Sequence, residues 1–414
     1  MVKISDTDFV AVGGASDSLS NNRYGYIVRY KYDAMGVLYG LNIFQIFINL
    51  LTGVDFDGSY IIATGMQGKR NGNGSRLIKL DLDGNLIYHK SYSNRSAMDI
   101  VYDRFSNSYV ILQRQRNLLI KTDINGNVIW SYDYRANVKE QPQALIVDND
   151  GNYVFVGHLG PDNGPANIEL LKINPSDGSI IYQKYYTSNI GISDERAYNI
   201  TLDYDGNYLI AGFVRESNTS SIPFAMKINK DNGSIIWVRA WISAPYGFSS
   251  NKGMGILSVN PEVYLLSGYI GSGADASSGM FFLFFRDTVA NCIRDITNSF
   301  SVGNLNLNRT SVSVSTSVIT STISDLTLNP YAPVVNESDV GGSCATPVSE
   351  NEYISSCQRG YIEIDLIKKR RVFIYDIAGN LVYKNDFEGR KRIKLKSGIY
   401  IVKIDNKKFK IIVQ

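Results

Sequence analysis

Cysteine and histidine are scarce: the 414 residues include only three Cys and two His. Cys292, Cys344 and Cys357 form no C-x-x-C pair, so a zinc site built from Cys and His is not expected. Cys344 and Cys357 flank a short polar segment and could pair in an oxidising compartment, with reduced thiols as the alternative. We therefore expect no metal and no cofactor.

Long hydrophobic runs are also missing. Residues 1–16, MVKISDTDFVAVGGAS, lack the basic start and apolar stretch of a signal peptide. Residues 40–51, GLNIFQIFINLL, contain Asn and Gln and are too short to span a bilayer. A formal charge of +3 gives no reason to expect a nucleic-acid partner. The sequence predicts no membrane span. We recognise no export leader at its start, so either a leader was removed or the protein never had one.

Catalytic motifs are missing as well. G-x-S-x-G, H-E-x-x-H and G-x-x-x-x-G-K-[ST] do not occur. The Gly-rich stretch at 68–75 precedes no helix that could present amide groups to a phosphate, so it is interpreted as a loop. His89 follows a turn at a position that the other repeats fill with Ser, Gln or Val, which predicts a solvent-facing side chain. His158 is predicted to open a loop and is the better ligand-binding candidate. No catalytic residue is assigned.

The chain does contain a repeated sequence motif, which we call the first phrase. IKLDLDGNLIYHKSY (78–92) returns as IKTDINGNVIWSYDY, LKINPSDGSIIYQKYY and MKINKDNGSIIWVRAW. Asp-Gly and Asn-Gly tolerate the positive φ of tight hairpin turns, so each phrase predicts two antiparallel strands and a structural turn. The predicted turns are Asp83-Gly84, Asn125-Gly126, Asp177-Gly178 and Asn232-Gly233.

A second phrase, of the type DNDGNYVFVGH, alternates with the first. Its tyrosines recur at roughly fifty residues, about the length of four short strands and their turns. One such sheet cannot bury both faces alone, but sheets stacked around an axis cover one another. We predict an all-β fold, a β-propeller of six blades, or seven if residues 301–330 add strands. The aligned tyrosines are Tyr60, Tyr109, Tyr153, Tyr208 and Tyr264.

The Asp-rich turns resemble calcium loops only superficially. An EF-hand loop needs a bidentate Glu at its twelfth position, where this chain has Tyr92, Leu159 and Val214. The Asp and Asn side chains are therefore predicted to form hydrogen bonds with their own backbone and to stabilise turns rather than to bind a metal. An aromatic residue ends each first phrase, and we expect it to pack between blades rather than to form a ring of ligand-stacking side chains. These aromatics are Tyr39, Tyr88, Trp130, Tyr182 and Trp237.

Composition changes after residue 300. Residues 1–300 are assigned to the propeller. The Ser/Thr-rich segment 301–330 is assigned to a strand pair that closes or flanks the propeller, with an extended connector as the alternative. Residues 331–358 are rich in Pro, Gly, Ser and acidic side chains and are predicted to be a linker. Residues 359–414 are predicted to form a small C-terminal β-sandwich. From Arg359 onward the sequence contains fifteen Lys/Arg and six Asp/Glu. Because the whole chain has a net charge of only +3, residues 1–358 are mildly acidic.

Two segments of the C-terminal unit, RVFIYDIAGNLVY (371–383) and IKLKSGIYIVKIDNKKFKIIVQ (393–414), form a characteristic pattern. This pattern resembles the sorting domain of the type IX secretion system of Bacteroidetes, although the usual Y-P-N-P opening is missing. It implies a protein selected by the secretion translocon and delivered to the outer-membrane surface or the medium. A unit appended for packing or solubility is the alternative. The matching positions are Tyr375, Asp376, Gly379, Val382, Leu395, Gly398, Tyr400, Val402 and Lys410.

Three functions remain open at this point. The favoured hypothesis is a secreted or cell-surface, non-enzymatic propeller that binds a protein or glycan. The second is a virion or receptor-binding component of a phage that infects Bacteroidetes, motivated by the missing leader. The third is a secreted polysaccharide-acting enzyme on a propeller scaffold. The repeats also resemble bacterial propellers of secreted and surface proteins, a likeness that concerns fold and not ligand.

Overall fold

The computed structural model divides the chain into two units, residues 1–338 and 339–414, which are described separately. The structure describes all residues except 17–22, 34–37, 47, 67–73, 93–94, 115, 137, 162–163, 218–219, 242–249, 272–278, 287–292, 320–322, 326–353, 359–360, 377–380, 396–397, 405–406 and 414. Within the described part, the one helical element is a 3₁₀ turn, η1 (Thr297–Ser299), and the other elements are strands.

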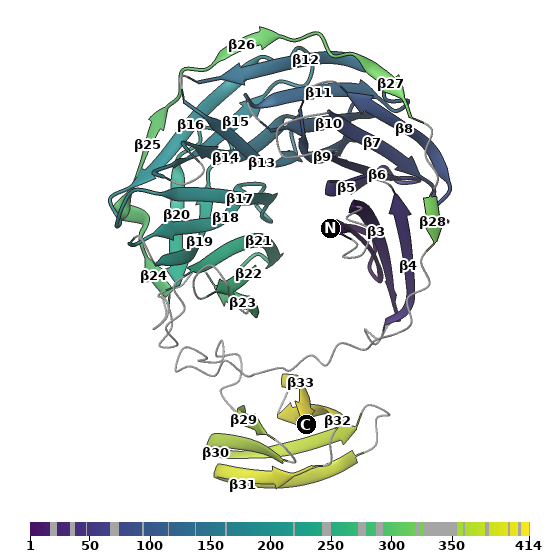
Figure 1. Cartoon of the computed structure of the whole chain (residues 1–414). Coiled ribbons are helices and arrows are strands. Elements are labelled where there is room, and N and C mark those ends of the chain that lie inside the picture. The colour runs from purple at the N-terminus through teal and green to yellow at the C-terminus, as the bar shows by residue number, and fades with distance from the viewer. Residues whose placement is uncertain are drawn as a thin grey trace. The chain divides into compact units, whose positions relative to one another are not determined.

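Six blades of antiparallel strands follow one another around a common axis in the first unit (Figure 1). Blades 1 to 4 are separate sheets, whereas a single parallel pairing between Ser221 and Ser250 joins blades 5 and 6. Blade 1 contains β1 (Val2–Ser5), β2 (Asp8–Ser16), β3 (Arg23–Tyr32) and β4 (Leu38–Ile46). Blade 2 contains β5 (Leu50–Phe56), β6 (Ile61–Met66), β7 (Ser75–Leu80) and β8 (Leu86–Tyr92). Blade 3 contains β9 (Ala97–Asp103), β10 (Ser108–Gln113), β11 (Leu118–Asp123) and β12 (Val128–Arg135).

Blades 4 to 6 continue the pattern. Blade 4 contains β13 (Glu140–Val147), β14 (Tyr153–Leu159), β15 (Asn167–Ile173) and β16 (Ile180–Ser188). Blade 5 contains β17 (Glu195–Leu202), β18 (Tyr208–Arg215), β19 (Ser221–Ile228) and β20 (Ile235–Trp241). Blade 6 contains β21 (Ser250–Asn260), β22 (Val263–Gly271) and β23 (Gly279–Arg286). The prediction of an all-β, six-bladed propeller is confirmed.

Residues 293–325 add a fifth strand to five of the blades, and we call this segment the belt. It visits the blades in reverse order, pairing with the outermost strand of blades 5, 4, 3, 2 and 1 in turn. Figure 1 shows it in green along the outside of the blades. Its strands are β24 (Ile293–Asp295), β25 (Phe300–Asn304), β26 (Asn308–Ser311), β27 (Thr316–Val318) and β28 (Ile323–Asp325).

The belt corrects the expectation for residues 301–330. The predicted strand pair is not formed, because the described strands of this segment pair with separate blades and not with each other. They add to sheets that already exist, so they build no seventh blade. Strict alternation correctly indicated extended chain, but it carried no information about the partner strands, which lie far away in the sequence.

Apolar side chains explain why the sheets stack. The second strand of blades 2 to 4 is buried at every position, as expected when both faces of a sheet are covered. Hydrophobic clusters lie between blades 1 and 2, 2 and 3, 3 and 4, 4 and 5, and 5 and 6. Each fully buried Val, Leu, Ile or Phe stabilises such an interface by about 1.5–3 kcal/mol.

The second unit is a small sheet of five strands. The long strand β30 pairs with β31 along one side, and with β29 and then β32 along the other; β33 follows β32. The register between β30 and β31 breaks between Leu366 and Arg370. The strands are β29 (Ile354–Gln358), β30 (Tyr361–Asp376), β31 (Leu381–Lys394), β32 (Gly398–Ile404) and β33 (Lys407–Val413).

Candidate functional site

The propeller has two chemically different faces. Because the strands are antiparallel, the turns after the first and third strands of a blade emerge on one face, which we call the turn face. The connections after the second and fourth strands emerge on the opposite, loop face. The repeated Asp-Gly and Asn-Gly phrases all lie on the turn face.

The turns themselves are backbone structures. Asp81 Oδ1 accepts hydrogen bonds from the amides of Asp83 (2.9 Å) and Asn85 (2.8 Å), and Asp123 repeats this arrangement in blade 3. The predicted turn glycines Gly84, Gly126, Gly178 and Gly233 have φ of +90°, +75°, +72° and +72°. Among the described residues, no group of three His, Cys, Asp or Glu side chains could hold a metal.

A second set of turn-face carboxylates connects neighbouring blades. In each case an Asp at the end of the first strand or directly after it meets a Lys from the third strand of its own blade and a Tyr hydroxyl from the next blade. The Tyr–Asp distances are 2.5, 2.6 and 2.9 Å, and the Lys–Asp distances are 3.2, 3.6 and 2.9 Å. These Asp–Lys–Tyr clusters are Asp57–Lys79–Tyr109, Asp103–Lys121–Tyr153 and Asp148–Lys172–Tyr208.

The pairing of these lysines was not predicted from the sequence, although their recurrence in the repeats indicates it. In each first phrase a Lys directly follows an apolar residue in the third strand of the blade, at Lys79, Lys121, Lys172 and Lys227. A buried charge is tolerated only when it is paired, so a recurrent Lys in a core strand predicts a recurrent carboxylate partner. Lys227 meets Asp203 at 2.6 Å, which repeats the intrablade half of the cluster in blade 5.

The tyrosine alignment needs one correction. Tyr109, Tyr153 and Tyr208 are fully buried, whereas Tyr60 is half-buried and Ile61 occupies the buried position beside it. The Lys79 ammonium lies 4.3 Å from the centroid of the Tyr60 ring. Tyr60 therefore contacts the Lys of its own blade, and Ile61 takes the buried position that Tyr109, Tyr153 and Tyr208 occupy in the other blades.

Aromatics at the end of the first phrase pack between blades, as expected. Tyr88 donates to the carbonyl oxygen of Ile124 (3.1 Å), and Tyr182 to that of Lys230 (3.2 Å), each in the next blade. Trp237 packs against Tyr264 of blade 6 with ring centroids 5.4 Å apart. The side chain of Tyr39 lies outside the described residues. On the turn face, the polar and aromatic groups are thus engaged in holding the blades together.

The loop face is different, because it carries a cavity of about 570 Å³ on blade 4, beside the connection from blade 3. The connection from β12 to β13, the loop between β14 and β15, and the belt all contribute to its wall. The lining is mostly apolar, with Lys139 and Asn167 as its polar members. The lining residues are Val138, Lys139, Leu159, Gly160, Pro161, Pro165, Asn167, Tyr185 and Leu305.

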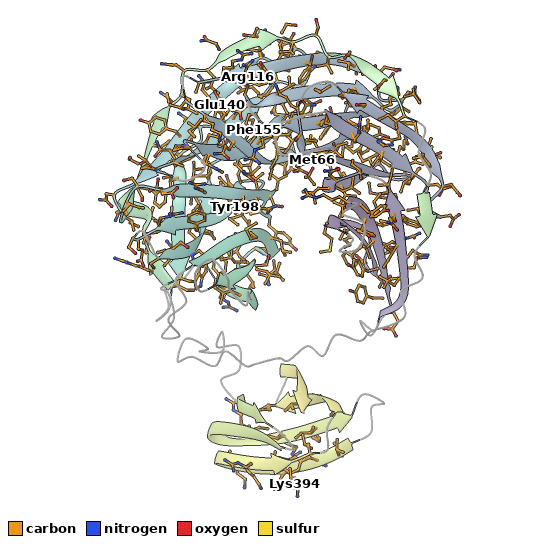
Figure 2. The ribbon with its side chains drawn as sticks, in the orientation of Figure 1. Met66, Arg116, Glu140, Phe155, Tyr198 and Lys394 are labelled. Carbon is orange, nitrogen blue, oxygen red and sulfur yellow. The ribbon has the colours of Figure 1, made fainter. Side chains whose placement is uncertain are left out.

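Two buried carboxyl groups lie on the strands that border this cavity. Glu140 pairs across the sheet with the lining residue Leu159, and Glu169 with the lining residue Tyr185. Glu169 is fully buried; its Oε2 accepts a hydrogen bond from Asn117 Nδ2 (3.0 Å), and its Oε1 has no partner among the described residues. Figure 2 shows Glu140 and Arg116 on this part of the propeller.

Burial controls the charge of both groups. It raises the pKa of Glu169 to about 8, an effect that Glu140 reinforces and Asn117 opposes. Burial also raises the pKa of Glu140, against the hydrogen bond from the Ala136 amide and the nearby Arg135 and Arg116. Glu169 is therefore protonated at neutral pH, a hydrogen-bond donor beside the cavity wall.

Neither histidine lies where the sequence placed it. His89, predicted to face solvent, is 2% exposed, because blades cover both faces of its sheet and β27 adds to the edge of β8. Burial, with nearby Arg76, lowers the pKa of His89 to about 4, so it is neutral. His158 lies inside β14 and not in a loop, and its ring packs edge-on against Tyr198 with centroids 6.4 Å apart.

The predicted sorting residues fall in the second unit. Val402 is buried in β32 and Leu395 follows β31 in a buried position, whereas Val382 in β31 is half exposed and Tyr375 in β30 is partly exposed. Asp376, Gly398, Tyr400 and Lys410 are in described strands, but their side chains are outside the described set, as is Gly379. The side chains of Cys292, Cys344 and Cys357 also lie outside it.

Comparison with known proteins identifies the second unit. The family model for secretion system C-terminal sorting domains matches residues 358–414. No curated protein sequence matches the chain. The similar solved structures include a luciferin-regenerating enzyme, 12% identical, with a TM-score of 0.37 over 67% of this chain and 95% of that one. A likeness at this level carries no argument about function.

The chain is thus a β-propeller followed by a secretion sorting domain. The sorting domain indicates export to the cell surface or the extracellular space through a secretion machinery. The described residues include no helix long and apolar enough to cross a bilayer.

Proposed function

We propose that the exported propeller is a binding protein, and that it holds an extracellular protein or glycan at the loop-face cavity on blade 4. The contrast between the two faces carries this proposal. Turn-face carboxylates are engaged in turns and blade contacts, whereas the loop face carries a cavity with a mostly apolar lining.

The chemistry of the cavity supports a ligand that is partly apolar. Its volume of about 570 Å³ is within the usual range for ligand sites of 300–1,000 Å³. Tyr185 and Pro161 offer flat apolar surfaces of the kind that suits a side chain or the apolar face of a sugar ring. Lys139 and Asn167 supply hydrogen bonds and one positive charge, which favour an anionic or hydroxyl-rich ligand.

The proposal is tested with two matched substitutions. Val138 lines the cavity and is 52% exposed, and Ile129 on the turn-face side of β12 is 55% exposed, so arginine costs little stability at either site. The purified full chain is applied to a glycan array and to immobilised extracellular proteins. We expect Val138→Arg to weaken the binding at least tenfold, and Ile129→Arg to change it less than twofold. A wild-type chain without any ligand, or equal binding by both variants, would refute the proposal.

A polysaccharide-acting enzyme is the second candidate. Glu140 and Glu169 favour it, because a carboxylic acid kept protonated near a second carboxyl group is what glycoside hydrolysis requires. Both side chains are buried, so a substrate in the cavity does not reach their carboxyl groups. Binding is therefore the favoured function. Turnover on a polysaccharide panel that disappears in a folded Glu169→Gln variant would reverse this order.

A further inference from the structure

The C-terminal residues 359–414 and the rest of the chain carry opposite charge. Residues 359–414 hold a surplus of nine positive charges, whereas the whole chain holds +3, so residues 1–358 are acidic by six. A surplus of this size in so short a unit creates a strong positive potential that attracts acidic partners. The question is which surface of the unit presents it.

The strand β30 separates the unit into an apolar and a polar side. Val372 and Ile374 are fully buried, together with Val402 and Ile404 of the neighbouring strand β32. Because side chains alternate along a strand, Arg371, Phe373 and Tyr375 lie on the other side. Arg371 is exposed there, and the two aromatic side chains are only partly buried.

Cross-strand neighbours complete this polar side. Arg371 pairs with Asp386 of β31, with Nε–Oδ1 and Nη2–Oδ2 distances of 2.8 and 3.1 Å. Phe373 pairs with Lys384, whose ammonium lies 5.5 Å from the ring centroid. The rings of Phe373 and Tyr375 are stacked, with centroids 6.2 Å apart and an angle of 15°.

The local charge is positive even after the ion pair is counted. The pKa of Asp386 is held below its ordinary value chiefly by Arg371, and Lys369 and Lys384 act in the same direction. Three cations therefore surround one carboxylate at an exposed position. We call the surface formed by Lys369, Arg371, Phe373, Tyr375 and Lys384 the cationic face.

We propose that the cationic face docks onto an acidic protein surface of the secretion machinery. The proposal rests on export through the sorting domain and is independent of ligand binding on the propeller. A membrane surface would be met by uniform positive charge, whereas this face combines an oriented Arg–Asp pair with a stacked aromatic pair. That mixture suits a protein partner with fixed carboxylates and an apolar contact.

Lys384 and Lys394 provide the matched test. Both are exposed on β31, ten residues and roughly 30 Å of extended strand apart. The full chain is expressed in a type IX-competent host that exports the wild-type protein, and the exported fraction is measured. We expect Lys384→Glu to reduce that fraction at least fivefold, Lys384→Gln to give an intermediate loss, and Lys394→Glu to stay within twofold of wild type. Equal export of the two Glu variants would overturn the proposal.

Two further measurements separate the alternatives. Thermal unfolding of the purified full-length variants should match wild type, since the substituted side chain is exposed; a lower unfolding temperature of Lys384→Glu alone would attribute the export defect to folding and overturn the proposal. Sedimentation with phosphatidylcholine–phosphatidylglycerol vesicles should show no binding that depends on Lys384. If it does, the partner is a membrane. Neither result bears on the Val138→Arg test, which reports on the loop face only.

Discussion

Removing Lys172 tests whether the Asp–Lys–Tyr clusters hold the blades together. The Lys172 ammonium lies 2.9 Å from Asp148 Oδ2, and the two side chains are 6% and 1% exposed. Lys172→Met keeps most of the packing but leaves Asp148 as a buried carboxylate without its cation. Breaking a buried pair in this way costs about 3–5 kcal/mol.

The remaining partners of Asp148 set the expected value within that range. Its Oδ2 keeps the hydroxyl of Tyr208 at 2.9 Å, and its Oδ1 keeps the amides of Asp150 and Asn152. We therefore expect the free energy of unfolding to fall by about 3 kcal/mol, the lower end of the range. Adding Asp148→Asn removes the stranded charge and should restore about 1–2 kcal/mol of that loss.

Urea unfolding of the full chain, followed by tryptophan fluorescence, provides the assay. The three Trp residues are all in the propeller, so the signal reports on that unit. Lys184→Met is the control, because this Lys makes one exposed hydrogen bond, to Asn304, and should cost less than about 1 kcal/mol. If Lys172→Met is no more destabilising than Lys184→Met, the clusters do not stabilise the blade contacts.

Three more predictions concern the turns, the buried carboxyl group and the belt. Gly178→Ala should cost about 2–3 kcal/mol in urea unfolding, because its φ is +72° and the added Cβ would lie 2.5 Å from a Tyr ring, whereas Gly13→Ala meets nothing within 4 Å and should be near neutral. Glu169 has a raised pKa in the folded state, so the folded protein binds the extra proton and loses stability as pH rises from the unfolded value near 4.5 towards 8. Glu169→Gln should flatten that loss by at least about 1 kcal/mol between pH 5 and pH 8; an unchanged pH profile would refute the assignment. Phe300→Ala, at the buried anchor of the belt, should destabilise by about 3 kcal/mol, and Val318→Ala, 75% exposed, by less than about 0.5 kcal/mol in the same experiment.

The propeller could be predicted from the sequence because its information is local and repeated. An Asp-Gly or Asn-Gly pair between apolar runs specifies a hairpin. Six such units can bury the apolar faces of their sheets by stacking around a common axis. The burial of His89 could not be predicted in this way, because it depends on neighbouring blades and on a belt strand more than two hundred residues away.

The candidate site was hidden for the same reason. Val138, Tyr185 and Leu305 come from a blade connection, an outer strand and the belt, and nothing in their local sequence indicates that they share a cavity. Glu169 is an acidic residue with apolar neighbours in the sequence. The sequence alone does not show whether such a side chain is buried or faces solvent. Only the stacking of blades 3 and 4 shows that this carboxyl group is buried.

The belt also makes the completion of the propeller a late step in folding. Its last strand, β28, pairs with β4, joining residues about 280 positions apart in the chain. Contacts of such separation form slowly, so until the belt arrives the outer strands of five blades present unpaired backbone groups on which another chain could add. A chain that stops before residue 293 would keep its hairpins but should self-associate through those edges, which makes the belt a guard against aggregation as much as a part of the fold.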